Sequence, residues 1–92
     1  MNKTIINTPN APAPIGPYSQ SVMTGNLLFV SGQIAIDPKT GNIEAKDAAA
    51  ETTRVMQNIE AILRQAGLDF SHVVKTTIFL SDMSLFTIVN EV

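Results

Sequence analysis

The hydrophobic positions in the first forty residues fall in short runs that are separated by proline, glycine and asparagine. Short apolar runs bounded by such residues are typical of β-strands joined by turns. We therefore expect strands over residues 3–7, 21–24 and 27–36. Gly25-Asn26 predicts a two-residue hairpin turn between the second and third strands, and residues 37–42 predict a further turn.

The hydrophobic spacing changes between residues 47 and 66, where apolar residues recur every three or four positions. This period predicts one helix with a continuous apolar face. Asp47 is placed to cap the start of the helix, and Gly67 is placed to end it in a left-handed conformation. The apolar face is expected to comprise Thr52, Val55, Met56, Ile59, Ile62, Leu63 and Ala66, with Glu51, Arg54, Asn58 and Arg64 largely outside it.

Two further elements are predicted after this helix. Residues 73–80 are rich in β-branched and aromatic side chains and predict a strand. Residues 81–84 offer capping side chains, and the apolar residues after them begin a second amphipathic helix. The order of elements is an α+β arrangement whose natural continuation is another strand. We therefore expect residues 1–92 to be a single domain that is incomplete at its C-terminus, with unpaired sheet edges that favour aggregation.

Length and composition allow one small globular domain. The absence of cysteine and the single histidine, His72, exclude disulfides, thiolate catalysis and metal sites built from several such ligands. The formal net charge is −2, and the basic residues are spread along the chain rather than concentrated as nucleic acids or anionic membranes usually require. Neither a signal-peptide pattern nor an apolar run of about 18 residues is present, so we expect a cytoplasmic protein.

Common catalytic arrangements find little support in the sequence. Ser31, His72 and Asp82 are the residue types of a hydrolytic triad, but no Gly-x-Ser-x-Gly pattern surrounds the serine. The glycines are not spaced ahead of a helix as in a phosphate-binding loop. The acidic residues fit solvated turn and helix positions. These patterns assign no metal ligand and no catalytic carboxylate.

The candidate chemistry lies in two neighbouring segments, residues 15–20 and 31–33. They place a phenol, hydroxyls, amides and glycines in or beside strands, where packing alone favours Val, Ile or Phe. Tyr18 offers an aromatic wall, Ser31 a hydroxyl, and Gly32 a backbone amide that a ligand can approach. Such a set suits an anionic or carbonyl-like group. The alternative is structural: Tyr18 packs at a surface, and Ser31-Gly32 is only a β-bulge.

Three motifs in these regions resemble those of one known family. They are Pro-Ile-Gly-Pro-Tyr-Ser-Gln at 14–20, Phe-Val-Ser-Gly-Gln-Ile at 29–34 and Pro-Lys-Thr-Gly at 38–41, with shorter matches at 58–59, 66–68, 74–77 and 89–90. Together they resemble the Rid family, also called the YjgF family, along the whole chain. The resemblance implies an α+β fold similar to chorismate mutase, with a mixed sheet and two helices on one face.

The same resemblance implies a function. Rid proteins hydrolyse reactive 2-imino acids, or their enamine tautomers, to 2-keto acids and ammonia, and they protect pyridoxal-phosphate enzymes in this way. They need no cofactor. They are homotrimers whose sheets form an inner barrel, with active sites in the clefts between subunits. By resemblance, Tyr18, Ser31, Gly32 and Asn90 would line such a cleft and bind a small imino acid.

Two further groups of the family's site have no counterpart in the matched motifs. They are an arginine that binds the substrate carboxylate and a glutamate that handles water, and the resemblance puts both beyond Val92. Arg54 and Arg64 match neither position, so we expect residues 1–92 alone to have little activity. Two other interpretations stay open: a non-catalytic trimeric module that binds small carboxylates, and the RNA-cleaving or translation-inhibiting role that some members are named for, which the acidic charge disfavours.

Overall fold

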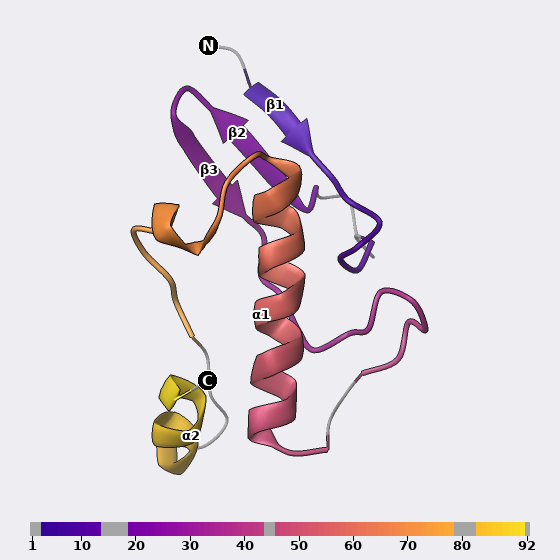
Figure 1. Ribbon diagram of the computed structural model, residues 1–92, viewed down its shortest axis with the longest axis vertical. Coiled ribbons are helices and arrows are strands. Elements are labelled where there is room, and N and C mark those ends of the chain that lie inside the picture. The colour runs from indigo at the N-terminus through magenta and orange to yellow at the C-terminus, as the bar shows by residue number, and fades with distance from the viewer. Residues whose placement is uncertain (1–2, 14–18, 44–45, 79–82, 92) are drawn as a thin grey trace.

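The computed structural model describes residues 3–13, 19–43, 46–78 and 83–91. Three strands come first: β1 (Lys3–Ile6), β2 (Ser21–Thr24) and β3 (Leu27–Val30). They are followed by helix α1 (Ala48–Gln65) and, near the end of the chain, helix α2 (Phe86–Glu91). Short 3₁₀ turns cover Phe70–His72 and Met83–Leu85. Figure 1 shows α1 along the long axis of the molecule, with the sheet at one end and α2 beside the first half of α1 at the other.

The three strands form an antiparallel sheet in the order β1-β2-β3. Gly25 has a φ of 58° and opens the two-residue turn between β2 and β3, as the sequence predicts. Asn26 has no positive φ, which is typical of a type II′ turn, where only the first central residue needs the left-handed region. The turn fixes the register of the hairpin, in which Thr24 pairs with Leu27 and Val22 with Phe29.

Both outer strands end earlier than predicted, at Ile6 and Val30 instead of residues 7 and 36. Asn7 leaves the strand ladder because its side-chain Oδ1, not its backbone, accepts the Gln20 amide at 3.1 Å. Beyond Val30 the described chain provides no partner strand apart from an isolated bridge between Ile36 and Ile43. A strand needs such a partner for its backbone groups, so the apolar pattern alone overestimates its length.

The two faces of the sheet differ in burial. Ile5, Val22 and Phe29 are cross-strand neighbours on one face. Ile5 and Phe29 are 55% and 61% exposed there, and Leu27 on the same face is 53% exposed. The opposite face holds Thr4, Ile6, Ser21, Met23, Leu28 and Val30, and of these only Thr4 is exposed. One face therefore contributes to the interior of this chain, and the other is an apolar surface open to solvent.

Helix α1 agrees closely with its prediction. The Asp47 side chain caps the helix by accepting the Ala50 amide at 2.7 Å. Gly67 follows the last turn with a φ of 79°, and its amide donates to the Arg64 carbonyl at 3.0 Å. Ile62 and Leu63, both predicted for the apolar face, are buried. The second predicted helix is confirmed by α2, which contacts α1.

Asn58 corrects the predicted polarity of α1. The sequence pattern placed it largely outside the apolar face, but its side chain is fully buried. Its Nδ2 donates to the carbonyl oxygens of Ile34 and Ile36 at 3.1 and 3.0 Å, and its Oδ1 accepts from Arg54 Nε at 3.2 Å. The amide thus joins α1 to the irregular chain that follows β3. Burial of a polar group is stable when its hydrogen bonds are made in this way.

The strand predicted over residues 73–80 is wrong for the part that the structure describes. Residues 73–78 are exposed and pair with no described strand, and residues 79–80 lie outside the described ranges. Val74 is 92% exposed and Ile78 is 59% exposed. The β-branched composition is present, but the neighbouring strand that it requires is not among the described residues. The described sheet is consequently antiparallel throughout rather than mixed.

The 3₁₀ turn at Phe70–His72 is closed by reciprocal hydrogen bonds. The Asp69 carboxylate accepts from the side chain and the amide of Ser71, and His72 Nδ1 accepts the Asp69 amide at 3.2 Å. The hydrogen bond from the Ser71 hydroxyl, followed by that from its amide, lowers the pKa of Asp69 below the ordinary value of 3.8.

This shift predicts an acid-sensitive turn. Because the folded-state pKa of Asp69 lies below the unfolded value, the contribution of its carboxylate to stability is complete above the unfolded pKa and is lost as pH falls through the lowered pKa. We expect Ser71→Ala to raise the pKa of Asp69 toward 3.8, as measured by the carboxyl ¹³C shift in an NMR titration. A pKa of Asp69 that is the same in both proteins would contradict this assignment.

Candidate functional site

Ser31 is held against the backbone immediately before β2. Its amide donates to the carbonyl oxygen of Gln20 at 2.9 Å, and its hydroxyl donates to the carbonyl oxygen of Ser19 at 2.6 Å. The carbonyl oxygen of Ser31 accepts the Gln33 side-chain amide at 3.1 Å. Both donors of Ser31 are therefore engaged within the chain. In this arrangement the hydroxyl presents its lone pairs to a ligand, and it can donate only by rotating away from Ser19.

Gly32 lies in open space next to this anchored serine. A Cβ built on it would meet no atom within 4 Å, and its φ is outside the left-handed region. Its amide makes no hydrogen bond to the described residues. No feature of the described fold therefore requires a glycine here, which argues against the bulge interpretation. The position suits close approach by a ligand or a second subunit.

A cavity of about 50 Å³ adjoins Gly32. Pro12 and Ala13 line it from the proline-rich segment, and Gln33, Ile34 and Ile36 line it from the chain after β3, together with Gln20. This volume is sufficient for one or two small groups at most. The cavity thus extends the region around Ser31 and Gly32 that the sequence selects as a candidate site.

The other predicted site residues are placed differently. Asn90 is an exposed residue of α2. Figure 1 shows α2 at the opposite end of the long axis from the sheet, so the chain does not bring Asn90 together with Ser31 and Gly32. Tyr18 lies outside the described residues, as does Asp82 of the rejected triad.

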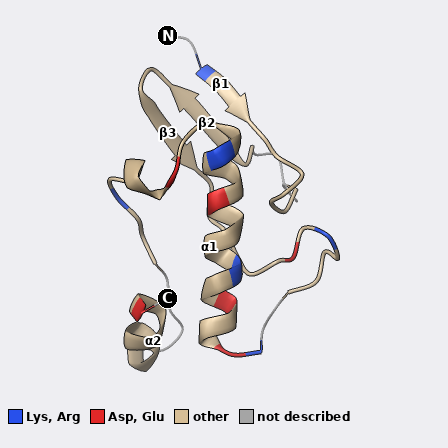
Figure 2. Cartoon of the chain, viewed as in Figure 1, with Lys and Arg blue, Asp and Glu red and all other residues tan. Residues whose placement is uncertain are grey.

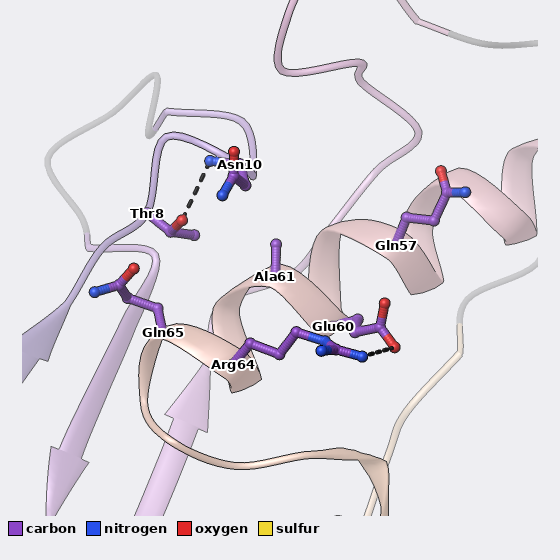
Figure 3. A pocket seen from close by; sticks show the side chains of 7 residues that line it. All are labelled: Thr8, Asn10, Gln57, Glu60, Ala61, Arg64 and Gln65. Carbon is purple, nitrogen blue, oxygen red and sulfur yellow. Dashed lines mark hydrogen bonds and ion pairs between the residues drawn. The ribbon is translucent and has the colours of Figure 1, made fainter.

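A larger groove of about 380 Å³ lies between the loop after β1 and the second half of α1. Figure 3 shows its lining, which includes Arg64 paired with Glu60 at 3.4 Å. The Thr8 hydroxyl accepts the Asn10 amide at 3.2 Å on the other side. Arg64 and Glu60 are largely solvated, with side chains 71% and 40% exposed. The groove is wide and polar, and no predicted site residue lines it.

The charged residues form no concentrated surface in the described chain. Figure 2 shows lysines and arginines on several elements, with acidic residues alternating with the arginines along α1. This distribution does not resemble the basic stripe of a nucleic-acid-binding surface. Within the described ranges, no helix combines the length and the apolar character needed to cross a bilayer.

Comparison with known families decides the relationship. The family model described as endoribonuclease L-PSP, which is that of the Rid or YjgF proteins, matches residues 8–92. The chain belongs to the Rid family. This result confirms the resemblance carried by the motifs at 14–20, 29–34 and 38–41.

Named Rid proteins match along almost the whole chain. The RutC family protein PH0854 of Pyrococcus horikoshii is 52% identical over 90 residues, which are 98% of this chain and 71% of the relative. The 2-iminobutanoate/2-iminopropanoate deaminase of Escherichia coli is 49% identical over 90 residues, which are 98% of this chain and 69% of that protein. The chain therefore spans about 70% of the length of these Rid proteins.

Solved structures of Rid proteins share the fold. The Rid protein YyfA of Yersinia pestis matches with a TM-score of 0.95 and 43% identity, over 98% of this chain and 71% of that one. E. coli TdcF with bound serine matches with a TM-score of 0.91 and 41% identity, over 96% of this chain and 68% of the other. The predicted α+β fold of the YjgF type is thus confirmed.

The Rid motif also contains a residue whose role the sequence analysis missed. Gln20 ends the first motif and is 3% exposed, with four hydrogen bonds from its side chain to residues 8–12. The sequence placed it only within a polar cluster. One available signal was its position directly before a strand, where a buried amide is stable only if several partners surround it.

Proposed function

We propose that this Rid protein hydrolyses 2-imino acids and their enamine tautomers, including 2-iminobutanoate and 2-iminopropanoate, to 2-keto acids and ammonia. Water adds to the C=N bond, the carbon retains the oxygen as a carbonyl, and the nitrogen leaves as ammonia without any redox change. The observation that carries the proposal is the 49% identity over 90 residues to the E. coli protein named for this reaction. We propose a cytoplasmic location for this chain.

The described geometry supports a binding site at Ser31 and Gly32. The Gly32 amide has no partner among the described residues and can donate to a substrate oxygen or nitrogen. The Ser31 hydroxyl, fixed on Ser19, can accept from the imine N–H or from water. Because an imine carbon is already electrophilic, the site needs mainly to orient the substrate and a water molecule. Tyr18 would close one wall, as the family resemblance implies.

We further propose that the protein acts as a homotrimer. Asn90 and Ser31 lie in parts of the chain that are separated along its long axis. A site containing both would therefore draw them from neighbouring subunits. The sheet face with Ile5, Leu27 and Phe29 exposed is an apolar surface that assembly would cover. Light scattering of the purified protein would give the subunit number directly.

The activity is tested by following an imine that is generated in the assay from threonine by a threonine dehydratase. Because the chain covers 69% of the E. coli deaminase, the assay compares residues 1–92 with a fusion in which the C-terminal part of that deaminase follows Val92. We expect the fusion to accelerate imine loss and ammonia release several-fold or more over the spontaneous rate, since oriented hydrolysis commonly gives at least this gain. Residues 1–92 alone are expected to show little acceleration. No acceleration by the fusion would refute the deaminase proposal.

A non-catalytic role is the second candidate, because both hydrogen-bond donors of Ser31 are engaged within the chain. The related TdcF was solved with bound serine. In this case titration with a small amino or keto acid would give saturable binding, while the imine assay would release no additional ammonia. The two measurements together separate the candidates.

A further inference from the structure

The side chain of Gln20 fastens the segment after β1 to the start of β2. Its Oε1 accepts the Thr8 amide at 2.6 Å. Its Nε2 lies within hydrogen-bond distance of the carbonyl oxygens of Thr8, Ala11 and Pro12, at 3.0, 3.1 and 2.8 Å. Two N–H groups are thus shared by three carbonyls in a site that is almost closed to water, with Gln20 only 3% exposed. Such a connected polar network fixes the positions of its members.

The backbone of Gln20 carries this constraint to Ser31. The Gln20 carbonyl accepts the Ser31 amide, and the adjacent Ser19 carbonyl accepts the Ser31 hydroxyl. The Gln20 amide is in turn held by Asn7 Oδ1 at 3.1 Å. Two consecutive carbonyls therefore place Ser31, and the interactions of Gln20 determine where those carbonyls lie.

Gln20 also lines the small cavity beside Gly32, together with Pro12, Ala13 and Gln33. The bond from its Nε2 to the Pro12 carbonyl fixes Pro12 relative to Gln20. The Gln20 carbonyl in turn holds the Ser31 amide, next to Gly32. Loss of the side-chain amide would therefore change both the position of Ser31 and the width of the cavity.

We propose that Gln20 is a positioning residue for imine hydrolysis, acting by holding Ser31 and Gly32 in register with the Pro12–Ala13 side of the site. This inference rests on the proposed function. It adds a residue that does not touch the reacting atoms and acts on them through Ser31 and Gly32. It explains why a buried amide occupies a position where an apolar side chain would serve packing alone.

The test replaces Gln20 by methionine, which keeps the length of the side chain and removes its hydrogen bonds. The destabilised control is Leu63→Ala, a change in the buried core. Both are assayed in the fusion with the C-terminal part of the E. coli deaminase, at a temperature at which circular dichroism shows them folded. We expect kcat/KM of Gln20→Met to fall roughly 10- to 100-fold per folded molecule, mainly in kcat, while Leu63→Ala keeps the kinetic constants of the parent. Equal kinetic constants in the two variants would overturn the proposal.

Asn7→Ala covers the case in which Gln20→Met does not fold. It removes only the acceptor for the Gln20 amide from an exposed residue, so the protein should stay folded. We expect a loss of activity in the same direction, on the order of 3-fold, because one of the constraints on the Gln20 backbone is removed. Unchanged activity in Asn7→Ala, with Gln20→Met unfolded, would overturn the proposal.

Amide hydrogen exchange tests the positioning role of Gln20 independently of the proposed deaminase activity. In Gln20→Met, or in Asn7→Ala if the former is unfolded, the Ser31 amide should exchange about 10-fold faster than in Leu63→Ala, because its acceptor carbonyl is no longer fixed. This readout needs no turnover. Absence of activity in the parent protein would therefore refute the deaminase function alone, whereas unchanged exchange at Ser31 would refute the positioning role.

Discussion

Replacement of Asn58 by leucine is expected to destabilise the protein by on the order of 3 kcal/mol. Leucine has the same number and branching of side-chain heavy atoms as asparagine, so the change removes the hydrogen bonds and largely keeps the shape of the side chain. The Ile34 carbonyl keeps a second donor, the Ile36 amide at 2.8 Å, but the Ile36 carbonyl loses its bond from Asn58 in a partly buried setting. An unsatisfied carbonyl that is partly buried, together with the hydrogen bonds lost from the fully buried Asn58, accounts for an effect of this size.

Thermal unfolding followed by circular dichroism measures this effect, with an expected decrease in Tm of about 15 °C for a domain of this size. Gln57→Leu is the matched control, since it also replaces a side-chain amide by leucine, at the neighbouring, exposed position of α1. We expect the control to change the free energy of unfolding by less than about 0.5 kcal/mol. A similar Tm for both variants would show that the buried amide of Asn58 contributes no more than a surface residue.

The elements that could be predicted from the sequence are those specified by neighbouring residues. The β2–β3 hairpin follows from Gly25 at the turn, and α1 follows from its period, the Asp47 cap and Gly67. The turn at 37–42 is equally local: the Asp37 side chain accepts the Lys39 amide, and Gly41 has a φ of 75°. In each case the interaction that fixes the structure spans only a few residues.

The elements that could not be predicted depend on distant partners. Asn58 appears polar and exposed in the helical pattern, but carbonyls 22 and 24 residues earlier in the chain make its burial stable. Gln20 is fixed by carbonyls 8 to 12 residues before it. Residues 73–78 have the composition of a strand without a described neighbour to pair with. Composition and hydrophobic period indicate which secondary structure and burial a residue prefers. The burial of Asn58 and Gln20 and the lack of a described partner strand for residues 73–78 depend instead on which distant residues the fold brings beside them.

The candidate site was partly accessible from sequence for the same reason. Ser31 and Gly32 are recognisable because their residue types are unfavourable in a strand. The structure places both directly after β3, and Gly32 lines a small cavity there. The network behind them was not accessible, because Gln20 reaches across to a separate segment of chain. A local exception in a pattern can therefore locate a site, while the residues that support it have to be read from contacts.

Gly32→Val is expected to lower kcat/KM for imine hydrolysis by roughly 100-fold while leaving the fold intact, because side-chain atoms would occupy the space next to the backbone that the substrate approaches. A Cβ at this position meets nothing within 4 Å, and its φ is outside the left-handed region. The free energy of unfolding should consequently change by less than about 1 kcal/mol. Gly32→Ala, with a smaller side chain, should give an intermediate loss of about 10-fold.

Gly41→Ala is the matched control, because for this variant we expect lower stability and unchanged activity, the opposite of Gly32→Val. Gly41 is an exposed turn residue with a φ of 75°, so alanine there is strained by about 1–2 kcal/mol although it meets no atom within 4 Å. We expect it to lower Tm and to leave kcat/KM per folded molecule unchanged. The Gly32 variants should therefore lose activity and keep their stability, whereas Gly41→Ala should lose stability and keep its activity. The reason is that, of these two glycines, only Gly41 has a positive φ. Full activity in Gly32→Val would show that Gly32 is not part of the substrate site.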